Sequence, residues 1–312
     1  MIRRMWPWLR VLVAVGILAV LVWRLGTDAF LDGVRSIDPP AVLAALGIGL
    51  VTTGCSAWRW CVVARGLGLR LPLRVAVADY YRALLLNAVL PAGVLGDVHR
   101  AVSHGHRSGD IGAGVRAVVL ERFAGQLALV AVAGAVLVTG PSLPFHLGPG
   151  LIVVAALAGL SLLVPAVRRA VLALWRDARR GVFTLRAAGP VAVSSVVTVA
   201  GHLAMFLVAA RVAGADVPFE TLLPLFVLAL LVMALPVNVG GWGPREAFLA
   251  VAFAATGLVP ALGLATAVVY GVLAVVAALP GALVLLRRSA QRREVVAEGR
   301  DESGEKVASL VG

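Results

Sequence analysis

The feature that most constrains this chain is a succession of apolar stretches, each about as long as a bilayer is thick, separated by short arginine-rich segments. A helix needs about 20 apolar residues to cross the hydrocarbon core of a membrane. Hydrophobic residues make up 61% of the chain and charged residues only 14%, whereas soluble domains carry about 25% charge. The chain therefore lacks the polar surface of a soluble enzyme, a disordered protein or a secreted disulfide scaffold. We predict an all-α, polytopic integral membrane protein.

Six stretches are apolar and long enough to predict full membrane spans, namely Leu9–Trp23, Ala41–Val63, Phe123–Thr139, Gly148–Val164, Pro190–Val212 and Leu262–Leu286. Two more, Val75–Leu95 and Leu222–Gly257, are interrupted by Pro and Gly, and we predict that they form broken helical hairpins. The second is also compatible with one full span followed by a short returning half-helix. We divide the chain into a transmembrane domain over residues 1–288 and a charged cytoplasmic tail over residues 289–312.

Basic residues lie almost entirely on one side of the predicted spans. Of the 28 Lys and Arg residues, 22 fall in segments that would share one face of the membrane, and three fall on the other face. Cytoplasmic loops carry such an excess in membrane proteins, so we predict a plasma-membrane protein with both termini in the cytoplasm. The same distribution explains the net charge of +12, and we expect no nucleic-acid partner.

The segment over residues 165–189 carries six arginines among Val and Leu residues, Trp175 and Phe183. This mixture is typical of an amphipathic helix on a membrane surface. We interpret the segment as a topology anchor. Attraction to anionic lipid, worth about 1 kcal/mol per basic residue near the surface, is compatible with the same helix.

The two interrupted stretches share a spacing, because residues 90–100 and 235–245 both read L-P-x4-G-x3-R. Three predicted spans separate them, so the two elements would enter the membrane from opposite faces. This is typical of inverted repeats, in which broken helices form the substrate site near the midplane. The alternative is coincidence, since Leu-Pro and Gly are common in a membrane protein rich in Ala, Gly and Pro.

The second interrupted stretch contains three glycines that we expect to leave backbone N–H groups uncovered, Gly240, Gly241 and Gly243. Pro244 is suited to the first turn of a new helix that continues with Arg245 and Glu246. Free N–H groups at a helix N-terminus, together with Arg245, form a phosphate-binding arrangement. Glu246 would hold Arg245 when no ligand is bound. A pair that merely fixes the hairpin is the alternative; we favour binding because an arginine inside the bilayer costs about 2.5 kcal/mol or more.

In the first interrupted stretch, polar residues recur at spacings of 3, 4 and 3 and share one helix face, namely Asp97, Arg100, His104 and Arg107. Arg100 would meet a phosphate and Asp97 a cationic group. A solvated helix at the membrane surface is the competing interpretation. Asp79 and Arg82, three residues apart, are predicted to form a structural salt bridge, and Asn87 to satisfy backbone groups near the break.

Four further polar residues lie in or beside predicted spans. Glu121 and Arg122 point about 100° apart, so we predict that they pair with different neighbours. Arg59 lies near the end of its span, and we interpret it as reaching the surface with no role in a site. His202 lies mid-span and is predicted to form an interhelical hydrogen bond.

The sequence contains no G-x-S-x-G, Walker A or dinucleotide-binding motif. The histidines at 99, 104 and 106 match no zinc spacing, so we expect neither a metal ion nor a cofactor. Catalysis inside the membrane would rely on Asp97, His99, Glu121 or Glu246. We therefore favour a non-enzymatic function.

Three motifs carry a family resemblance: N-A-V-L-P-A-G-V-L-G-D-V-H-R at 87–100, V-L-E-R-F at 119–123 and P-V-N-V-G-G-W-G-P-R-E-A at 236–247. Together, and in this order, they resemble the lysylphosphatidylglycerol synthase transmembrane region, also called the flippase-like domain family. The first motif has Leu95-Gly96-Asp97 where members often show Gly-Gly-Asp. The preference for Arg over Lys resembles that of proteins from high-GC bacteria.

The resemblance implies a bacterial plasma-membrane protein that handles lipids or lipid-linked head groups. In the best-known members this module flips an aminoacylated phospholipid made by a C-terminal soluble synthase domain. Only 26 residues follow Leu286, so we do not expect aminoacyl transfer by this chain. Carried over by position, the residues that would line or gate the lipid route are Asp97, Arg100, Glu121, Arg122, Arg245 and Glu246.

These observations lead to the hypothesis of a lipid flippase or head-group transporter without covalent chemistry. It would bind a phospholipid or a polyprenyl-phosphate-linked lipid between the two broken elements. One alternative is a membrane-embedded transferase that uses Asp97 or Glu121 as a base. Another is an accessory subunit of a lipid or glycan synthesis complex, working with a separate synthase or glycosyltransferase.

Overall fold

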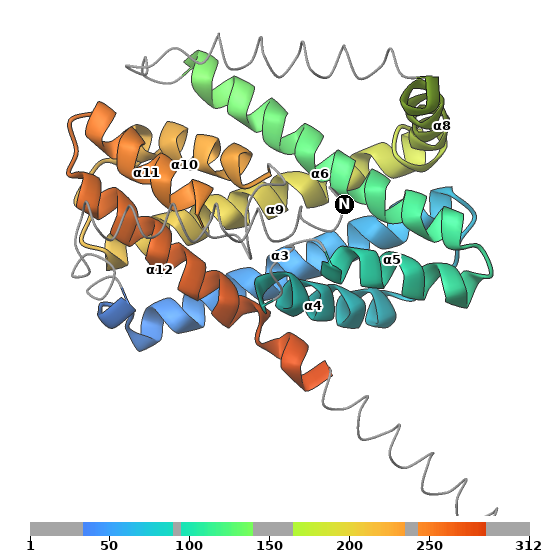
Figure 1. The fold of residues 1–312 in the computed structure, drawn as a ribbon, viewed down its shortest axis with the longest axis horizontal. Coiled ribbons are helices and arrows are strands. Elements are labelled where there is room, and N and C mark those ends of the chain that lie inside the picture. The colour runs from blue at the N-terminus through green and yellow to red at the C-terminus, as the bar shows by residue number, and fades with distance from the viewer. Residues whose placement is uncertain (1–33, 90–94, 140–164, 235–242, 285–312) are drawn as a thin grey trace, which may run out of the picture.

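A computed structural model describes residues 34–89, 95–139, 165–234 and 243–284. Within these ranges the chain forms helices and no strand, as predicted (Figure 1). The helices are α3 (Pro39–Gly66), α4 (Leu73–Val89), α5 (Leu95–Ser108), α6 (Ile111–Thr139), α8 (Pro165–Gly181), α9 (Leu185–Val212), α10 (Phe219–Ala234), α11 (Pro244–Ala255) and α12 (Pro260–Ala278).

Four of these helices are long and apolar enough to cross a membrane: α3, α6, α9, and α12 with its continuation to Val284. They coincide with four of the six predicted spans. The other two predicted spans, Leu9–Trp23 and Gly148–Val164, lie outside the described residues, as does the predicted tail over 289–312. α6 begins at Ile111, twelve residues before its predicted start, so Glu121 and Arg122 lie within the helix.

Local sequence signals explain where the long helices begin. The Asp38 carboxylate accepts a hydrogen bond from Ala41 N at 2.9 Å, and Pro39 occupies the first turn of α3. The Thr184 hydroxyl accepts from Ala187 N in the same way at the start of α9. Side-chain oxygens in these positions satisfy N–H groups that the helix leaves open, and Pro suits the first turn because its missing donor is not needed there.

The two interrupted stretches each form a pair of short helices, α4 with α5 and α10 with α11. Helices α10 and α11 contain 16 and 12 residues, which is about 24 and 18 Å at 1.5 Å per residue and shorter than the ~30 Å hydrocarbon core. α4 and α5 lie at the end where α3 stops and α6 starts, whereas α10 and α11 lie at the end where α9 stops and α12 starts (Figure 1). The predicted hairpins therefore sit at opposite ends of the long helices. Residues 90–94 and 235–242, at the breaks, lie outside the described residues.

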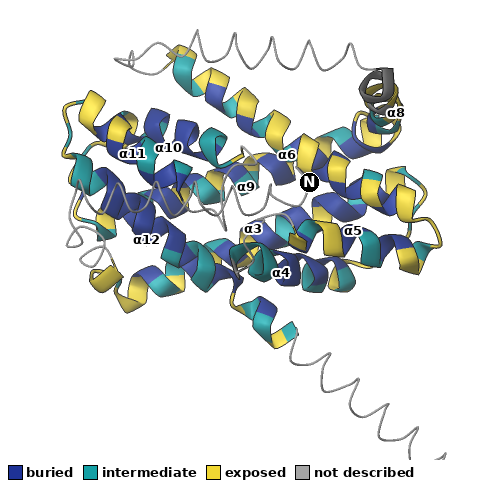
Figure 2. Cartoon of the chain, viewed as in Figure 1, coloured by how far each residue is buried: buried dark blue, intermediate teal, exposed yellow. Residues whose placement is uncertain are grey.

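The predicted amphipathic segment is helical as α8, at the same end of the molecule as α4 and α5 (Figure 1). Exposed positions recur along the long helix α6 (Figure 2). They include a row of apolar residues, Val115, Val119, Phe123, Leu127 and Val130. Their spacing of three or four residues places them on one side of the helix. An apolar outer face of this kind is suited to lipid tails.

The buried interior differs between the two ends of the molecule. Around α10, α11 and α12 it is mostly apolar, apart from Arg245 and Glu246, and Phe206 stacks on Phe226 and on Tyr270 at centroid distances of 5.1 and 3.9 Å. Around α3, α4, α5 and α6 a smaller apolar cluster surrounds buried charges that include Arg59, Arg100 and Glu121. Polar chemistry is therefore concentrated at the α4–α5 end.

Candidate functional site

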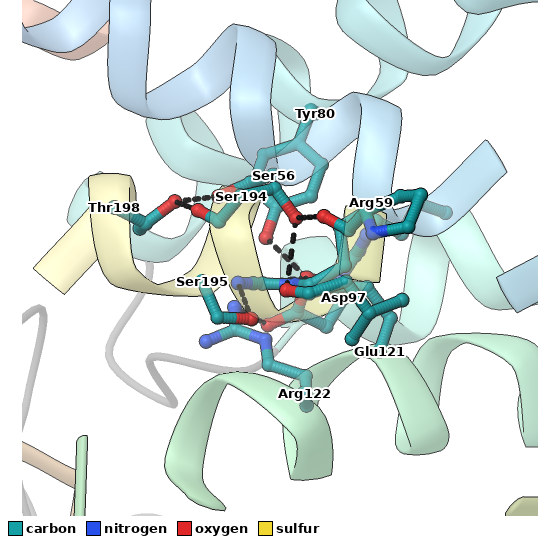
Figure 3. Close-up of polar contacts among 12 residues, drawn as sticks. Ser56, Arg59, Tyr80, Asp97, Glu121, Arg122, Ser194, Ser195 and Thr198 are labelled. Atoms are coloured by element: carbon teal, nitrogen blue, oxygen red, sulfur yellow. Dashed lines mark hydrogen bonds and ion pairs between the residues drawn. The ribbon is translucent and has the colours of Figure 1, made fainter. Parts of the chain in front are cut away.

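A buried carboxylate, Glu121 on α6, lies at the centre of the polar interior (Figure 3). Its Oε1 accepts hydrogen bonds from Arg59 Nε at 3.0 Å, Arg59 Nη2 at 2.5 Å and the Tyr80 hydroxyl at 3.2 Å. Its Oε2 accepts from Arg100 Nη2 at 2.7 Å. One carboxylate thus joins α3, α4, α5 and α6, and both of its oxygens are occupied.

Arg59 does not reach the surface, so its interpretation as a snorkelling residue is wrong. The residue is 4% exposed, and besides Glu121 its Nη1 donates to Ser195 Oγ on α9 at 3.0 Å. α3 continues to Gly66, which places Arg59 two turns inside the helix and between α6 and α9. Gly125 provides the space, since a Cβ added there would lie 3.1 Å from Arg59 Nη2.

Arg100 on α5 is fully buried between two aromatic rings. Its guanidinium carbon lies 4.4 Å from the Tyr80 ring centroid and 4.8 Å from that of Trp60, a stacking that favours a cation. Its Nε donates to Asp97 Oδ1 at 2.8 Å. Arg100 Nη1 and Trp60 Nε1 are buried donors with no hydrogen-bond partner among the described residues.

The face of α5 predicted from the 3, 4, 3 spacing is turned mainly toward the protein. His104 is buried and meets the Trp60 ring edge-on, at 5.4 Å between centroids. α5 is not one of the spanning helices, and there burial, assisted by the Arg107 guanidinium, lowers the pKa of His104. Arg107 is the exposed member and pairs with Asp79. The solvated-helix interpretation is therefore wrong for Arg100 and His104.

Asp97 connects this interior to the surface. Its Oδ2 accepts from Asn87 Nδ2 at 3.1 Å and forms an ion pair with Arg122, whose side chain is 45% exposed. Asn87 also accepts from Gly96 N at 2.8 Å, which confirms its predicted role at the break. A Cβ on Gly96 would lie 2.1 Å from the carbonyl oxygen of Ala83, so α4 and α5 approach this closely only because position 96 is glycine.

We refer to Arg59, Arg100, Arg122, Asp97 and Glu121 as the ionic network. Glu121 pairs with Arg59 and Arg100 while Arg122 pairs with Asp97, which confirms that the adjacent residues 121 and 122 choose different partners. Three guanidiniums face two carboxylates, so the network carries a net charge of +1. Arg122, whose side chain is 45% exposed, is the member that an anionic group could reach, and such a group would remove the imbalance.

The second interrupted stretch is arranged differently. Arg245 and Glu246 are both buried and pair with each other, with Arg245 Nε donating to Glu246 Oε1 at 3.0 Å. The Arg245 guanidinium carbon lies 5.1 Å from the Tyr270 ring centroid. α11 begins at Pro244, as predicted. Gly243, at φ 105°, adopts a conformation that favours glycine.

One expectation at this element is wrong: Gly243 does not present an uncovered N–H. Glu246 Oε2 accepts a hydrogen bond from Gly243 N at 2.6 Å, because a Glu in the third helical position reaches back to the residue before the helix. Gly240 and Gly241 lie outside the described residues. Glu246 therefore pairs with Arg245, as expected, and also accepts a hydrogen bond from the N–H of Gly243, the residue before the helix.

Two other predicted contacts are present. Asp79 accepts from Arg82 Nη2 at 2.7 Å, the predicted salt bridge, and His202 Nδ1 lies 3.1 Å from the Tyr270 hydroxyl, the predicted interhelical bond. Sequence reasoning missed Arg59, Tyr80 and Ser195 as partners in the site. An arginine in an apolar span was the available signal for the first, because such a residue is expensive unless it is paired.

Comparison with known proteins gives one family. The family model described as "Lysylphosphatidylglycerol synthase TM region" matches residues 8–290, which include every residue of the ionic network and the Arg245–Glu246 pair. No curated protein matches the chain.

Proposed function

Because the chain belongs to the lysylphosphatidylglycerol synthase transmembrane-region family, a membrane protein family related to lipids, we propose that it binds and translocates a phosphate-bearing membrane lipid. The observation that carries this proposal is the ionic network, which has one guanidinium in excess and reaches the surface at Arg122. A lipid phosphodiester carries one negative charge and would neutralise the excess. Guanidinium groups also match phosphate oxygens in geometry.

The shared carboxylate of Asp97 suggests how the phosphate is taken up. Asp97 is held by Arg100 and Asn87 as well as by Arg122. A phosphate at Arg122 therefore replaces one of several partners of Asp97 and leaves no buried charge alone. In the same exchange Asp97 gains the capacity to accept a hydrogen bond from a cationic head group. A phospholipid with a phosphate and an amine would satisfy both residues.

The unpartnered donors deeper in the site extend this route inward. Arg100 Nη1 and Trp60 Nε1 are buried without acceptors among the described residues. An acceptor-rich group such as phosphate would supply acceptors for buried donors that otherwise carry a desolvation penalty. The sequence Arg122, Arg100, Arg59 then offers successive guanidiniums from the surface toward the interior of the helix bundle.

At the opposite end, we propose that the Arg245–Glu246 pair is a second binding position. Release of Glu246 would make Arg245 Nε and the N–H of Gly243 available to another acceptor, and together they resemble an anion site at a helix N-terminus. Gly240 and Gly241 belong to this proposed position by their place in the sequence. A lipid head group would pass from the network to this pair.

Sidedness follows from the charge distribution. We propose a bacterial plasma-membrane location with both termini cytoplasmic, because 22 of 28 basic residues occupy the same predicted face. This orientation places the exposed Arg122 end toward the cytoplasm and the Arg245 end toward the outside.

The alternative of a membrane-embedded transferase is weakened by Glu121, whose oxygens both accept from guanidiniums and are unavailable as a base.

The test is lipid translocation in proteoliposomes, with a panel of labelled phospholipids and a labelled polyprenyl-phosphate lipid. Arg122→Gln is expected to reduce the translocation rate by about tenfold or more, since a hydrogen bond to a charged group is worth about 1.5–3 kcal/mol. Arg116→Gln is the matched control: Arg116 also lies on α6, is 43% exposed and pairs with an aspartate. It should leave the rate near wild type.

Arg245→Ala tests the second position in the same assay. Translocation that depends on the head group and is lost in Arg245→Ala would support a route joining both ends. Wild-type rates in both Arg122→Gln and Arg245→Ala would contradict the proposal. Rates no higher than in empty vesicles, with folded protein, would favour the partner-dependent alternative.

A further inference from the structure

One face of α8 is fixed against the helix bundle. Ala178 and Val182 are buried in a cluster with Leu120, the residue before Glu121. Arg116 Nε on α6 pairs with Asp177 Oδ2 at 2.8 Å. A Cβ on Gly66, the last residue of α3, would lie 2.5 Å from Gly181 Cα. These contacts determine which side of α8 turns outward.

The outward side carries large apolar residues. Val171, Leu172 and Trp175 are exposed, as is Phe183 just after the helix. At 100° per residue, positions 171, 172 and 175 fall within an arc of about 100°. The rings of Trp175 and Phe183 lie 5.6 Å apart. Trp and Phe at the edge of a membrane protein are typical of the lipid interface.

Arginines border this apolar side. Arg176, Arg179 and Arg180 are exposed, and within the described ranges none of the three forms an ion pair with a carboxylate. Asp177, the single acidic residue of α8, is already paired with Arg116. The outer face of α8 therefore presents an apolar strip beside uncompensated positive charge, which is complementary to a surface with acyl chains beneath negative head groups.

We propose that the outer face of α8, formed by Val171, Leu172, Trp175, Arg176, Arg179 and Arg180, is a binding surface for anionic phospholipids of the bilayer. The apolar residues insert among the upper acyl segments and the arginines contact phosphates. This surface is separate from the ionic network and does not depend on translocation. A zwitterionic lipid also offers a phosphate, but its cationic group offsets that charge and leaves the arginines uncompensated, so the surface selects lipids by net charge.

Fluorescence quenching of Trp175 in proteoliposomes tests the proposal on the full chain. Brominated phosphatidylglycerol and brominated phosphatidylcholine are compared at equal mole fraction, and the signal of Trp175 is obtained as the difference between wild type and Trp175→Phe. We expect several-fold stronger quenching by the anionic lipid at low salt and a smaller preference at 0.5 M salt, because screening weakens contacts at the surface.

The triple variant Arg176→Gln/Arg179→Gln/Arg180→Gln should lose most of this several-fold preference, because basic residues near the surface supply the attraction to anionic lipid. Its control, Arg65→Gln/Arg70→Gln/Arg74→Gln, removes three exposed arginines between the last turn of α3 and the first turn of α4 and should retain it. Equal quenching by both lipids would show an anchor without head-group selection and overturn the proposal. Absence of Trp175 quenching by either lipid would also overturn it, because the face would then contact protein or water.

Discussion

The two interrupted stretches share the spacing L-P-x4-G-x3-R, yet their arginines lie in different surroundings. Arg100 contacts residues of α3, α4, α5 and α6, including Trp60, Tyr80 and Glu121. Arg245 pairs with the next residue, Glu246, and stacks on the Tyr270 ring. The first arginine is therefore part of a network that joins four helices, whereas the second pairs with its neighbour in sequence and stacks on a ring of α12.

This difference has a physical consequence for how each site can respond to a ligand. In the network a displaced partner such as Asp97 retains other contacts, so exchange leaves no charge unpaired. In the Arg245–Glu246 pair, the same carboxylate accepts from Arg245 and from Gly243 N, so a ligand that displaces Glu246 must replace both hydrogen bonds. The α4–α5 end is thus suited to exchange of partners, and the α10–α11 end to a pair that opens only when a strong ligand is present.

The variant with the largest expected effect on stability is Glu121→Gln, which removes the central carboxylate of the ionic network. It leaves Arg59 without a carboxylate and Arg100 with only Asp97, and breaking a buried ion pair costs about 3–5 kcal/mol. We expect the largest fall in Tm, measured in nanodiscs of fixed lipid composition. The double variant Arg59→Met/Glu121→Gln should recover part of the loss, since one orphaned charge is then removed. A single variant as stable as wild type would show that the network is dispensable.

Glu246→Gln is the matched change at the other end, and it should cost about 3 kcal/mol, the lower end of the range for a buried pair, because one guanidinium rather than two loses this carboxylate. The amide oxygen still accepts from Gly243 N, and Arg245 keeps its contact with Tyr270. The same unfolding assay checks the order of the two variants. If Glu246→Gln proves more damaging than Glu121→Gln, the distinction between a network and a local pair is wrong.

Gly96→Ala tests the α4–α5 end through backbone packing, because it leaves every charged residue of the network in place. The added methyl group would meet the Ala83 carbonyl, and overpacking of this kind costs about 1–3 kcal/mol. Separation of α4 from α5 should also weaken the Asn87 contact with Gly96. Gly134→Ala on α6 is the control, because nothing lies within 4 Å of its added Cβ; it should be neutral or slightly stabilising. Equal stability of the Gly96→Ala and Gly134→Ala variants would contradict the close approach of α5 to α4 at Gly96.

The smallest effects are expected from two tyrosines that stack on the two arginines. Tyr80→Phe removes one donor from Glu121, and Tyr270→Phe removes the partner of His202. Each retains the ring beneath its arginine, so each should cost about 0.5–1.5 kcal/mol. A loss in either variant as large as that of Glu121→Gln would show that the hydroxyl, and not the ring, supports that site.

Sequence reasoning located the charged residues of both elements but not their partners. The 3, 4, 3 spacing predicts Asp97 and Arg100 as site residues and the family resemblance adds Glu121; the structure places the three together. For Arg59, its place near the end of the apolar stretch predicts a position at the surface. The helix in fact continues to Gly66 and is covered by α6 and α9, and burial by distant helices leaves no local pattern.

The sequence by itself determined the membrane class, the four long helices within the described ranges, the two interrupted hairpins and the amphipathic α8, because hydrophobic length, helix-breaking residues and periodicity are local properties of the chain. Only the tertiary structure decided that Glu121 joins four helices, that Arg59 belongs to the network, and that Glu246 closes the N–H of Gly243. Ion pairing in a low-dielectric interior depends on distances between residues far apart in sequence. Those distances are fixed by helix packing, to which contacts such as that of Gly96 with Ala83 contribute.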